Sequence, residues 1–377
     1  MNLLHNLNFM KAKVLKHYSS LMLLVFLSLL SLCHASAGDD QPPYKSCVES
    51  CEKSGCVDNS CFNSCKFPVG IDPEGDPSST KSLDSAYELF LKEPLYLRWK
   101  KWDCTSECRY QCMVREEAKR ESNGQLPLKY HGKWPFVRFF SLQEPASVAF
   151  SVLNLLVHFQ GFSSFLVLVY YKLPLSAHGS PHYEYVSLWA VYGLLSMNSW
   201  IWSTVFHSRD VRFTEMLDYS SAVALLGYSL ILAVIRTGGM RAEAARVMVS
   251  APITAFISTH ILYLNLYKFD YGWNMQVCVV IGVTQMFLWA VWACRSCHPA
   301  RYKLLTVVFG ASLAMLLEIY DFPPLWGILD AHAIWHATTV PITYLWWSFI
   351  KDDAKFRTKL LISKTEATKA NKSRKSQ

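Results

Sequence analysis

Residues 185–235 read YVSLWAVYGLLSMNSWIWSTVFHSRDVRFTEMLDYSSAVALLGYSLILAVI. Two apolar stretches, 185–206 and 214–235, are joined by a few polar residues. A helix needs about 20 predominantly apolar residues to cross a bilayer, so each stretch is long enough to span one. This part of the sequence therefore predicts two membrane helices joined by a short turn.

Similar apolar stretches recur between Pro145 and residue 350. The chain of 377 residues is 51% hydrophobic and only 18% charged, which is too apolar for an ordinary soluble protein. We therefore predict an all-α integral membrane protein with a core of seven transmembrane helices at residues 146–350. The predicted spans are 146–171, 185–206, 214–235, 247–267, 274–294, 303–320 and 330–350.

The first 37 residues have the features of a secretory signal peptide. Three lysines precede an apolar stretch at 20–32, and Ala35 and Ala37 give a small-x-small cleavage pattern. An uncleaved anchor helix is the alternative. The predicted organisation is a signal peptide (1–37), a lumenal cysteine-rich domain (38–145), a membrane core (146–350) and a basic cytoplasmic tail (351–377).

Eight cysteines lie between residues 47 and 112, after the predicted signal peptide. They are Cys47, Cys51, Cys56, Cys61, Cys65, Cys104, Cys108 and Cys112. Several are four positions apart, which places two thiols on one face of a helix. In an oxidising lumen this spacing favours short helices joined by up to four disulfides, with zinc binding as the competing interpretation. The sequence alone does not choose the pairing.

The distribution of lysine and arginine predicts the orientation in the membrane. With the N-terminal domain in the lumen, the first, third and fifth connections are cytoplasmic, and they carry more basic residues than the lumenal ones. The tail at 351–377 has nine basic and three acidic residues, which is also typical of a cytoplasmic segment. Nucleic-acid binding is a poor interpretation of this charge, because the tail has no aromatic platform and the chain no nucleic-acid module.

Polar residues cluster at the predicted lumenal ends of three spans. Ser203 and His207 end the second span, Asp218 begins the third, and His332 and His336 begin the last. Ionisable side chains are costly in a membrane, so each needs an explanation. Three histidines with an open fourth position are typical of a catalytic zinc site, where zinc lowers the pKa of a bound water. In this interpretation Asp218 accepts the proton of that water, and Ser203 orients Asp218 or stabilises the oxyanion.

Other interpretations of these polar residues stay open. A single histidine in a span is more often a packing residue than a ligand. We expect His158 to be a packing or lining residue, and we do not expect His260 to belong to the site. Glu318 and Asp321, at the end of the sixth span, either line an entrance or lie at the interface. A Ser203–His207 nucleophile pair is conceivable, although neighbours one helical turn apart rarely have the required geometry.

Ser203, His207 and Asp218, followed far downstream by His332 and His336, resemble the motif of the CREST superfamily of seven-helix membrane hydrolases. The stretches NSWIWSTVFHSRD (198–210), FTEMLDYSSA (213–222) and DAHAIWHATTVP (330–341) are similar to its Per-one-like family of post-GPI-attachment factors. The resemblance implies that His207, His332 and His336 hold zinc and that Asp218 and Ser203 are catalytic. It also implies removal of the sn-2 acyl chain from the phosphatidylinositol of GPI-anchored proteins, a phospholipase A-two type reaction.

The expected substrates are thus GPI-anchored proteins, together with lipids of the lumenal leaflet. The final residues 374–377 (RKSQ) look like a variant of a dibasic retrieval signal, which favours the endoplasmic reticulum or the Golgi. Two alternatives remain: a ceramidase-like amidohydrolase with the same site, and a non-enzymatic seven-helix receptor or chaperone with a structural metal.

Overall fold

The computed structural model describes residues 37–65, 102–139, 141–176 and 178–375. These residues form two compact units. One comprises His34–Glu144 and Pro323–Asp330, and the other includes Pro145–Phe322 and Ala331–Gln377. The predicted signal peptide lies almost entirely outside the described residues. We call the unit that comprises His34–Glu144 and Pro323–Asp330 the disulfide unit, and we call the other the helical unit.

The disulfide unit is built on two helices, α2 (Pro42–Ser54) and α5 (Cys104–Ser122). Between them lie the short strands β1 (Cys56–Val57) and β2 (Ser60–Cys61) and the 3-10 turn η2 (Asn63–Cys65). Asp103 caps α5 by accepting a hydrogen bond from the backbone N–H of Ser106, and Gly55 ends α2 in the left-handed conformation. Local sequence signals thus account for the start of α5 and the end of α2.

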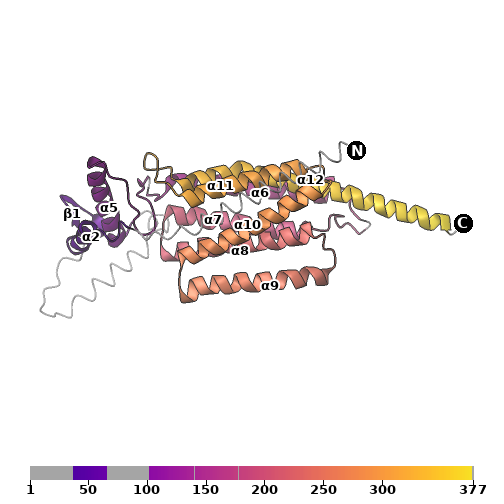
Figure 1. The fold of residues 1–377 in the computed structure, drawn as a ribbon, viewed down its shortest axis with the longest axis horizontal. Helices are drawn as coiled ribbons and strands as arrows, with labels where there is room; N and C mark the ends of the chain where they lie inside the picture. The colour runs from indigo at the N-terminus through magenta and orange to yellow at the C-terminus, as the bar shows by residue number, and fades with distance from the viewer. Residues whose placement is uncertain (1–36, 66–101, 140, 177, 376–377) are drawn as a thin grey trace. The chain divides into compact units, whose positions relative to one another are not determined.

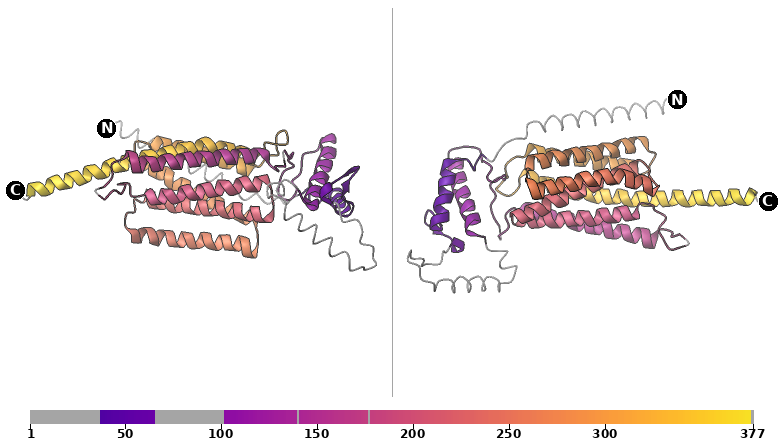
Figure 2. Two further views of the ribbon diagram at one scale, coloured as in Figure 1. Left: turned by 180° about the vertical axis from the view of Figure 1, so that it is seen from behind. Right: turned by 90° about the horizontal axis from the view of Figure 1, so that it is seen from below.

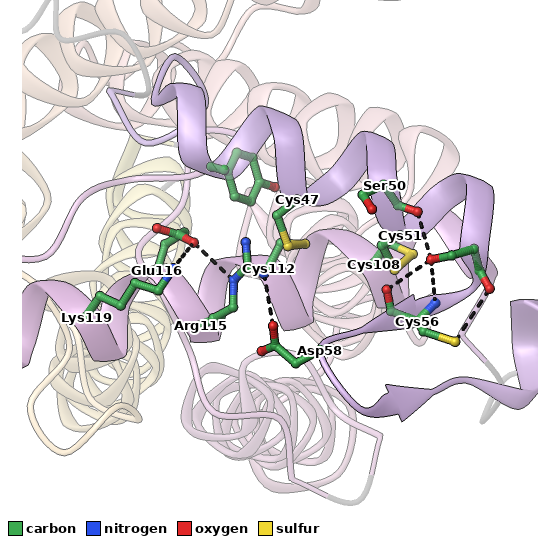
Figure 3. Close-up of a disulfide and its surroundings, with 12 residues drawn as sticks. Cys47, Ser50, Cys51, Cys56, Asp58, Cys108, Cys112, Arg115, Glu116 and Lys119 are labelled. Atoms are coloured by element: carbon green, nitrogen blue, oxygen red, sulfur yellow. Dashed lines mark hydrogen bonds and ion pairs between the residues drawn. A yellow bond between two sulfur atoms is a disulfide. The ribbon is translucent and has the colours of Figure 1, made fainter.

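All eight cysteines of this unit form disulfides, which confirms the prediction of four bridges. The pairs are Cys47–Cys112, Cys51–Cys108, Cys56–Cys61 and Cys65–Cys104. The first two join α2 to α5 in antiparallel order, because the four-residue spacing presents two sulfurs on one face of each helix (Figure 3). Arg115 on α5 also pairs with Asp58 in the turn between β1 and β2, at 3.3 Å.

We expect the Cys51–Cys108 bridge to contribute much of the stability of this unit. Both cysteines are fully buried, and the bridge joins residues 57 apart in sequence. The double change Cys51→Ala and Cys108→Ala should therefore lower the free energy of unfolding by ~2–5 kcal/mol. The matched control is Cys56→Ala with Cys61→Ala, which removes a bridge between residues only 5 apart, one of them exposed, and should cost less. Limited proteolysis of the disulfide unit measures both, and equal losses would contradict the prediction.

The helical unit is a bundle whose helices run alongside one another (Figure 1). Each of the seven predicted spans is helical. The helices are α6 (Pro145–Val167) with the π-helical turn η4 (Leu168–Lys172), α7 (Val186–Ser208), α8 (Arg212–Thr237), α9 (Glu243–Leu262) with the π-helical turn η5 (Tyr263–Tyr267), α10 (Tyr271–Arg295), α11 (Arg301–Tyr320) and α12 (Ala331–Lys375).

Five of these helical segments are long and apolar enough to cross a membrane: α6 with η4, α8, α9 with η5, α10 and α11. Helices α7 and α12 do not reach that level of hydropathy, because they carry many Ser, Trp, Tyr and His residues. Seven spans therefore stay a prediction. The segment after residue 350, which was expected only as a basic tail, continues α12 beyond the bundle as one long helix (Figure 1).

Close packing of α6 against both α7 and α12 positions the residues discussed below. A Cβ atom at Gly161 of α6 would lie 2.2 Å from the Trp347 ring on α12, so only glycine permits this approach. The surrounding core contains large aromatic side chains that are almost fully buried, including Phe165, Trp189 and Phe349. In contrast, α9 packs mainly against α8 and lies at the edge of the bundle (Figure 2).

A buried ion pair ties α8 to α12. Both Nε and Nη2 of Arg236 donate to the Asp353 carboxylate, which is fully buried. The hydroxyl of Tyr183 also donates to it at 2.6 Å. His298 Nε2 lies 3.3 Å from the same carboxylate but lacks the alignment of a hydrogen bond. The Asp353 carboxylate thus joins α12 to α8 and to Tyr183, which lies just before α7.

Candidate metal centre

Three histidines from two helices converge on one point in the helical unit. His207 lies in the last turn of α7, while His332 and His336 lie in the first turns of α12. The Nε2 atom of His332 is 3.3 Å from Nε2 of His207 and 2.9 Å from Nε2 of His336. The four-residue spacing of His332 and His336 places both rings on one face of α12. The structure thus brings together all three predicted ligands.

The donor set fits a zinc ion. Tetrahedral coordination with Zn–N distances of about 2.0–2.1 Å separates two ligand nitrogens by roughly 3.3 Å. The His332–His207 separation of 3.3 Å matches this value, and the His332–His336 separation is slightly shorter. Ligand atoms of the three histidines all lie within 4.8 Å of one another. Three imidazoles leave a fourth position open, as in catalytic zinc sites.

The outer nitrogens of two of these histidines have hydrogen-bond partners. Nδ1 of His332 lies 2.7 Å from Oε2 of Glu318, which projects from α11. Nδ1 of His336 lies 3.3 Å from the Ser151 hydroxyl on α6. An acceptor at Nδ1 keeps the proton there and leaves the Nε2 lone pair directed at the shared point. Ligand histidines are commonly held by such partners.

Neither partner was predicted for this role. The sequence pattern predicts that Glu318 lines an entrance or lies at the interface, and it predicts no role for Ser151. A polar stripe on α6 could have indicated Ser151, since Ser147, Ser151 and Asn154 are all buried on one face of an apolar helix. Asn154 lies on the same side, because its Nδ2 donates to the backbone carbonyl of His336 at 2.8 Å.

The predicted catalytic residues Ser203 and Asp218 are both buried in the same unit. The Ser203 hydroxyl is 3.1 Å from that of Ser151, so it connects to His336 through one intervening side chain. Asp218 lies near the start of α8, the helix that packs against α7. Their catalytic roles remain proposals.

The cluster is more accessible at one side than at the other. His207 and His336 are buried, whereas the side chain of His332 is 32% exposed and that of Glu318 is 20% exposed. Trp335 stacks on His332, and Trp200 packs edge-on against His336. Aromatic rings thus pack directly against two of the three histidines.

Two further histidines in predicted spans have other partners. Nδ1 of His158 accepts a hydrogen bond from the Trp347 indole at 3.1 Å, so it serves the packing of α6 against α12. Nε2 of His260 lies 3.1 Å from Oδ1 of Asn274 on α10. Cys65, Cys104 and Cys108 also lie close enough to hold a metal, but all three are in disulfides. In the disulfide unit, the prediction of disulfides is therefore confirmed over the competing prediction of zinc binding.

Comparison with known proteins identifies the family. The family model described as "Per1-like family" matches residues 94–354, more than half of the chain. The chain belongs to the Per1-like family. All three histidines of the cluster lie within the matched residues.

Curated relatives of this Per1-like chain are similar over most of its length. A zebrafish (Danio rerio) protein named GPI-specific phospholipase A2-like PGAP3 is 35% identical over 85% of this chain and 91% of its own length. The mouse (Mus musculus) protein of the same name is 34% identical over 89% of this chain and 94% of its own. A Schizosaccharomyces pombe protein named Protein PER1 homolog is 34% identical over 90% of this chain and 93% of its own.

The Glu318–His332 hydrogen bond leads to a prediction about metal affinity. Glu318→Gln replaces a carboxylate acceptor by a weaker amide, so zinc affinity of the purified protein should fall about 10–100-fold. Competition with a chromophoric chelator measures this without any lipid substrate. Asp321→Asn is the matched control, because it removes an equal charge at the end of the same helix. Unchanged affinity in the Glu318→Gln protein would show that the carboxylate does not hold His332 for a metal.

Proposed function

We propose that this Per1-like chain is a zinc-dependent membrane hydrolase that removes the sn-2 acyl chain from the phosphatidylinositol of GPI-anchored proteins. The observation that carries the proposal is the convergence of three histidine Nε2 atoms from α7 and α12. The carboxylate of Glu318 contacts Nδ1 of one of these histidines, His332. The names of the curated relatives support the substrate class, since several are called GPI-specific phospholipase A2-like.

In this proposal His207, His332 and His336 hold the ion. When bound, zinc acts as a Lewis acid that polarises a carbonyl and lowers the pKa of water. Glu318 and Ser151 keep two of the ligand rings in the tautomer that presents Nε2. This arrangement needs no movement of the ligands before the reaction, because the rings are already aimed at one point.

The reaction is ester hydrolysis. Water adds to the acyl carbonyl carbon, the bond from that carbon to the glycerol oxygen breaks, and a fatty acid and a lyso-lipid are released. We assign the acceptance of the water proton to Asp218, whose carboxylate is buried in α8. Ser203 is assigned the orientation of the polar groups around His336, through its contact with Ser151. The glycerol oxygen takes up a proton as it leaves.

The proposed setting is the endoplasmic reticulum or Golgi membrane, with the disulfide unit in the lumen and the end of α12 in the cytoplasm. Four disulfides support an oxidising compartment for the N-terminal unit. GPI-anchored proteins carry their lipid in the lumenal leaflet, and an acyl ester at the headgroup boundary would lie at the depth of the first turns of α12.

Mass spectrometry of GPI-anchor lipids tests this function. Cells that lack the protein should retain unsaturated sn-2 acyl chains on the anchor, and the wild-type chain should restore remodelling. Purified protein should release fatty acid and lyso-lipid, and a chelator should stop the release. Release of a fatty acid from ceramide instead would favour amide hydrolysis, and no product from either lipid would favour a non-enzymatic role.

A further inference from the structure

A cavity of about 480 Å³ lies between the start of α11 and the part of α12 that follows its predicted span. Asp352, Lys355, Phe356 and Lys359 line it from α12, and Lys303 lines it from the first turn of α11. The four residues of α12 fall on one face because their spacing follows the helical repeat. Two helices distant in sequence therefore build one polar site.

The cavity has an excess of positive charge. Three lysines line it, with Asp352 as the one acidic side chain. Lys303 is bonded to this carboxylate and to the hydroxyl of Ser348, while Lys355 lies 3.4 Å from the carboxylate. Lys359 is exposed and has no ion pair among the described residues. The cavity thus has two more ammonium groups than carboxylates, and it is open to the surface.

Its depth corresponds to a membrane surface. Asp352 follows His332 by 20 residues along the same helix, which is about 30 Å at a rise of 1.5 Å per residue. This distance is about the thickness of the hydrocarbon core of a bilayer. With α12 spanning the membrane as predicted, the cavity lies at the opposite membrane face from the histidine cluster. Exposed aromatic rings at this level, Tyr302 and Phe356, are typical of the interface.

We propose that this cavity binds the headgroup of an anionic phospholipid whose phosphate is a monoester, in the leaflet opposite the metal centre. A phosphomonoester carries close to two negative charges at neutral pH, which matches the excess charge of the cavity better than a phosphodiester does. Lysines bind phosphate as point charges, and the N-terminal end of α11 adds a favourable dipole.

A lipid rather than a soluble phosphate is the proposed ligand because of where the cavity lies. Basic clusters directly beyond a membrane span face the anionic lipids of the cytoplasmic leaflet, and basic pockets between membrane helices bind phosphorylated headgroups. The site is separate from the metal centre and does not depend on the proposed hydrolase activity.

The test measures binding of fluorescent phosphatidic acid to the purified full-length protein in detergent micelles. The double variant K355Q/K359Q changes only exposed side chains and should bind about 30-fold more weakly, the loss expected for two basic residues at an anionic membrane surface. D352N, which removes the carboxylate among the lysines, should bind more tightly. The control K364Q/K369Q removes the same charge from residues further along the chain and should bind as the wild type does.

Three results would overturn the proposal: unchanged binding in K355Q/K359Q, an equal loss in the control, or equal affinity for phosphatidylcholine. Competition with glycerol 3-phosphate distinguishes the source of the phosphate. If this soluble compound displaces the lipid at similar concentrations, the cavity recognises phosphate alone and the lipid assignment is wrong. Weak competition by glycerol 3-phosphate, together with the loss in K355Q/K359Q, supports it.

Discussion

Replacing His332 with alanine should abolish remodelling of GPI-anchor lipids while the protein still folds and reaches its membrane. The change removes the histidine whose Nε2 lies 3.3 and 2.9 Å from the Nε2 atoms of His207 and His336. Asp218→Ala should have a comparable effect by removing the proposed proton acceptor, a contribution of ~10²–10⁴-fold. Mass spectrometry of anchor lipids in complemented knockout cells measures both.

The matched control is His260→Gln, which changes an imidazole in another helix and keeps a polar group beside Asn274. It should leave remodelling intact. Ser203→Ala should be milder than either site variant, because the serine reaches His336 only through Ser151. If folded His332→Ala or Asp218→Ala protein remodels anchors at the wild-type rate, the hydrolase assignment is wrong and a scaffold role takes its place.

Replacing Asp353 with alanine should destabilise the helical unit by about 3–5 kcal/mol. The change leaves the guanidinium of Arg236 buried without its counter-ion, and it also removes the acceptor of the Tyr183 hydroxyl. An unpaired charge in this setting costs far more than the ion pair itself contributes. Thermal unfolding of the purified protein in detergent, followed by circular dichroism, measures the loss.

The adjacent Asp352→Ala serves as the control, because this carboxylate is partly exposed and pairs with Lys303 at the surface. It should cost no more than about 1 kcal/mol. The double variant Arg236→Leu with Asp353→Leu should recover much of the stability lost in Asp353→Ala, since neither charge is then left buried alone. A similar loss in Asp352→Ala and Asp353→Ala would mean that burial of the pair does not decide its contribution.

Much of the histidine cluster could be predicted from sequence, because the expected membrane topology places the ends of different helices together. Helices that cross the same bilayer place corresponding ends at corresponding depths, so His207 and His332 were expected at one level before any contact was known. The spacing of His332 and His336 added a shared helix face. The partners of the outer nitrogens could not be predicted in this way. Glu318 and Ser151 lie 14 and 185 positions from the histidines they contact, and a local pattern such as the polar stripe on α6 shows which side chains face inward but not which histidine they contact.

The sequence by itself determined the helical character of the chain, a preference for disulfides among the N-terminal cysteines, and the identity of the three clustered histidines. These features follow from local composition and spacing, since apolar length decides a span and a four-residue interval decides a helix face. Only the tertiary structure decided which cysteine joins which, that Pro323–Asp330 belongs with the disulfide unit, and that Asp353 holds Arg236. Such features depend on packing between segments far apart in the chain, where shape and burial select one partner among many that local sequence allows.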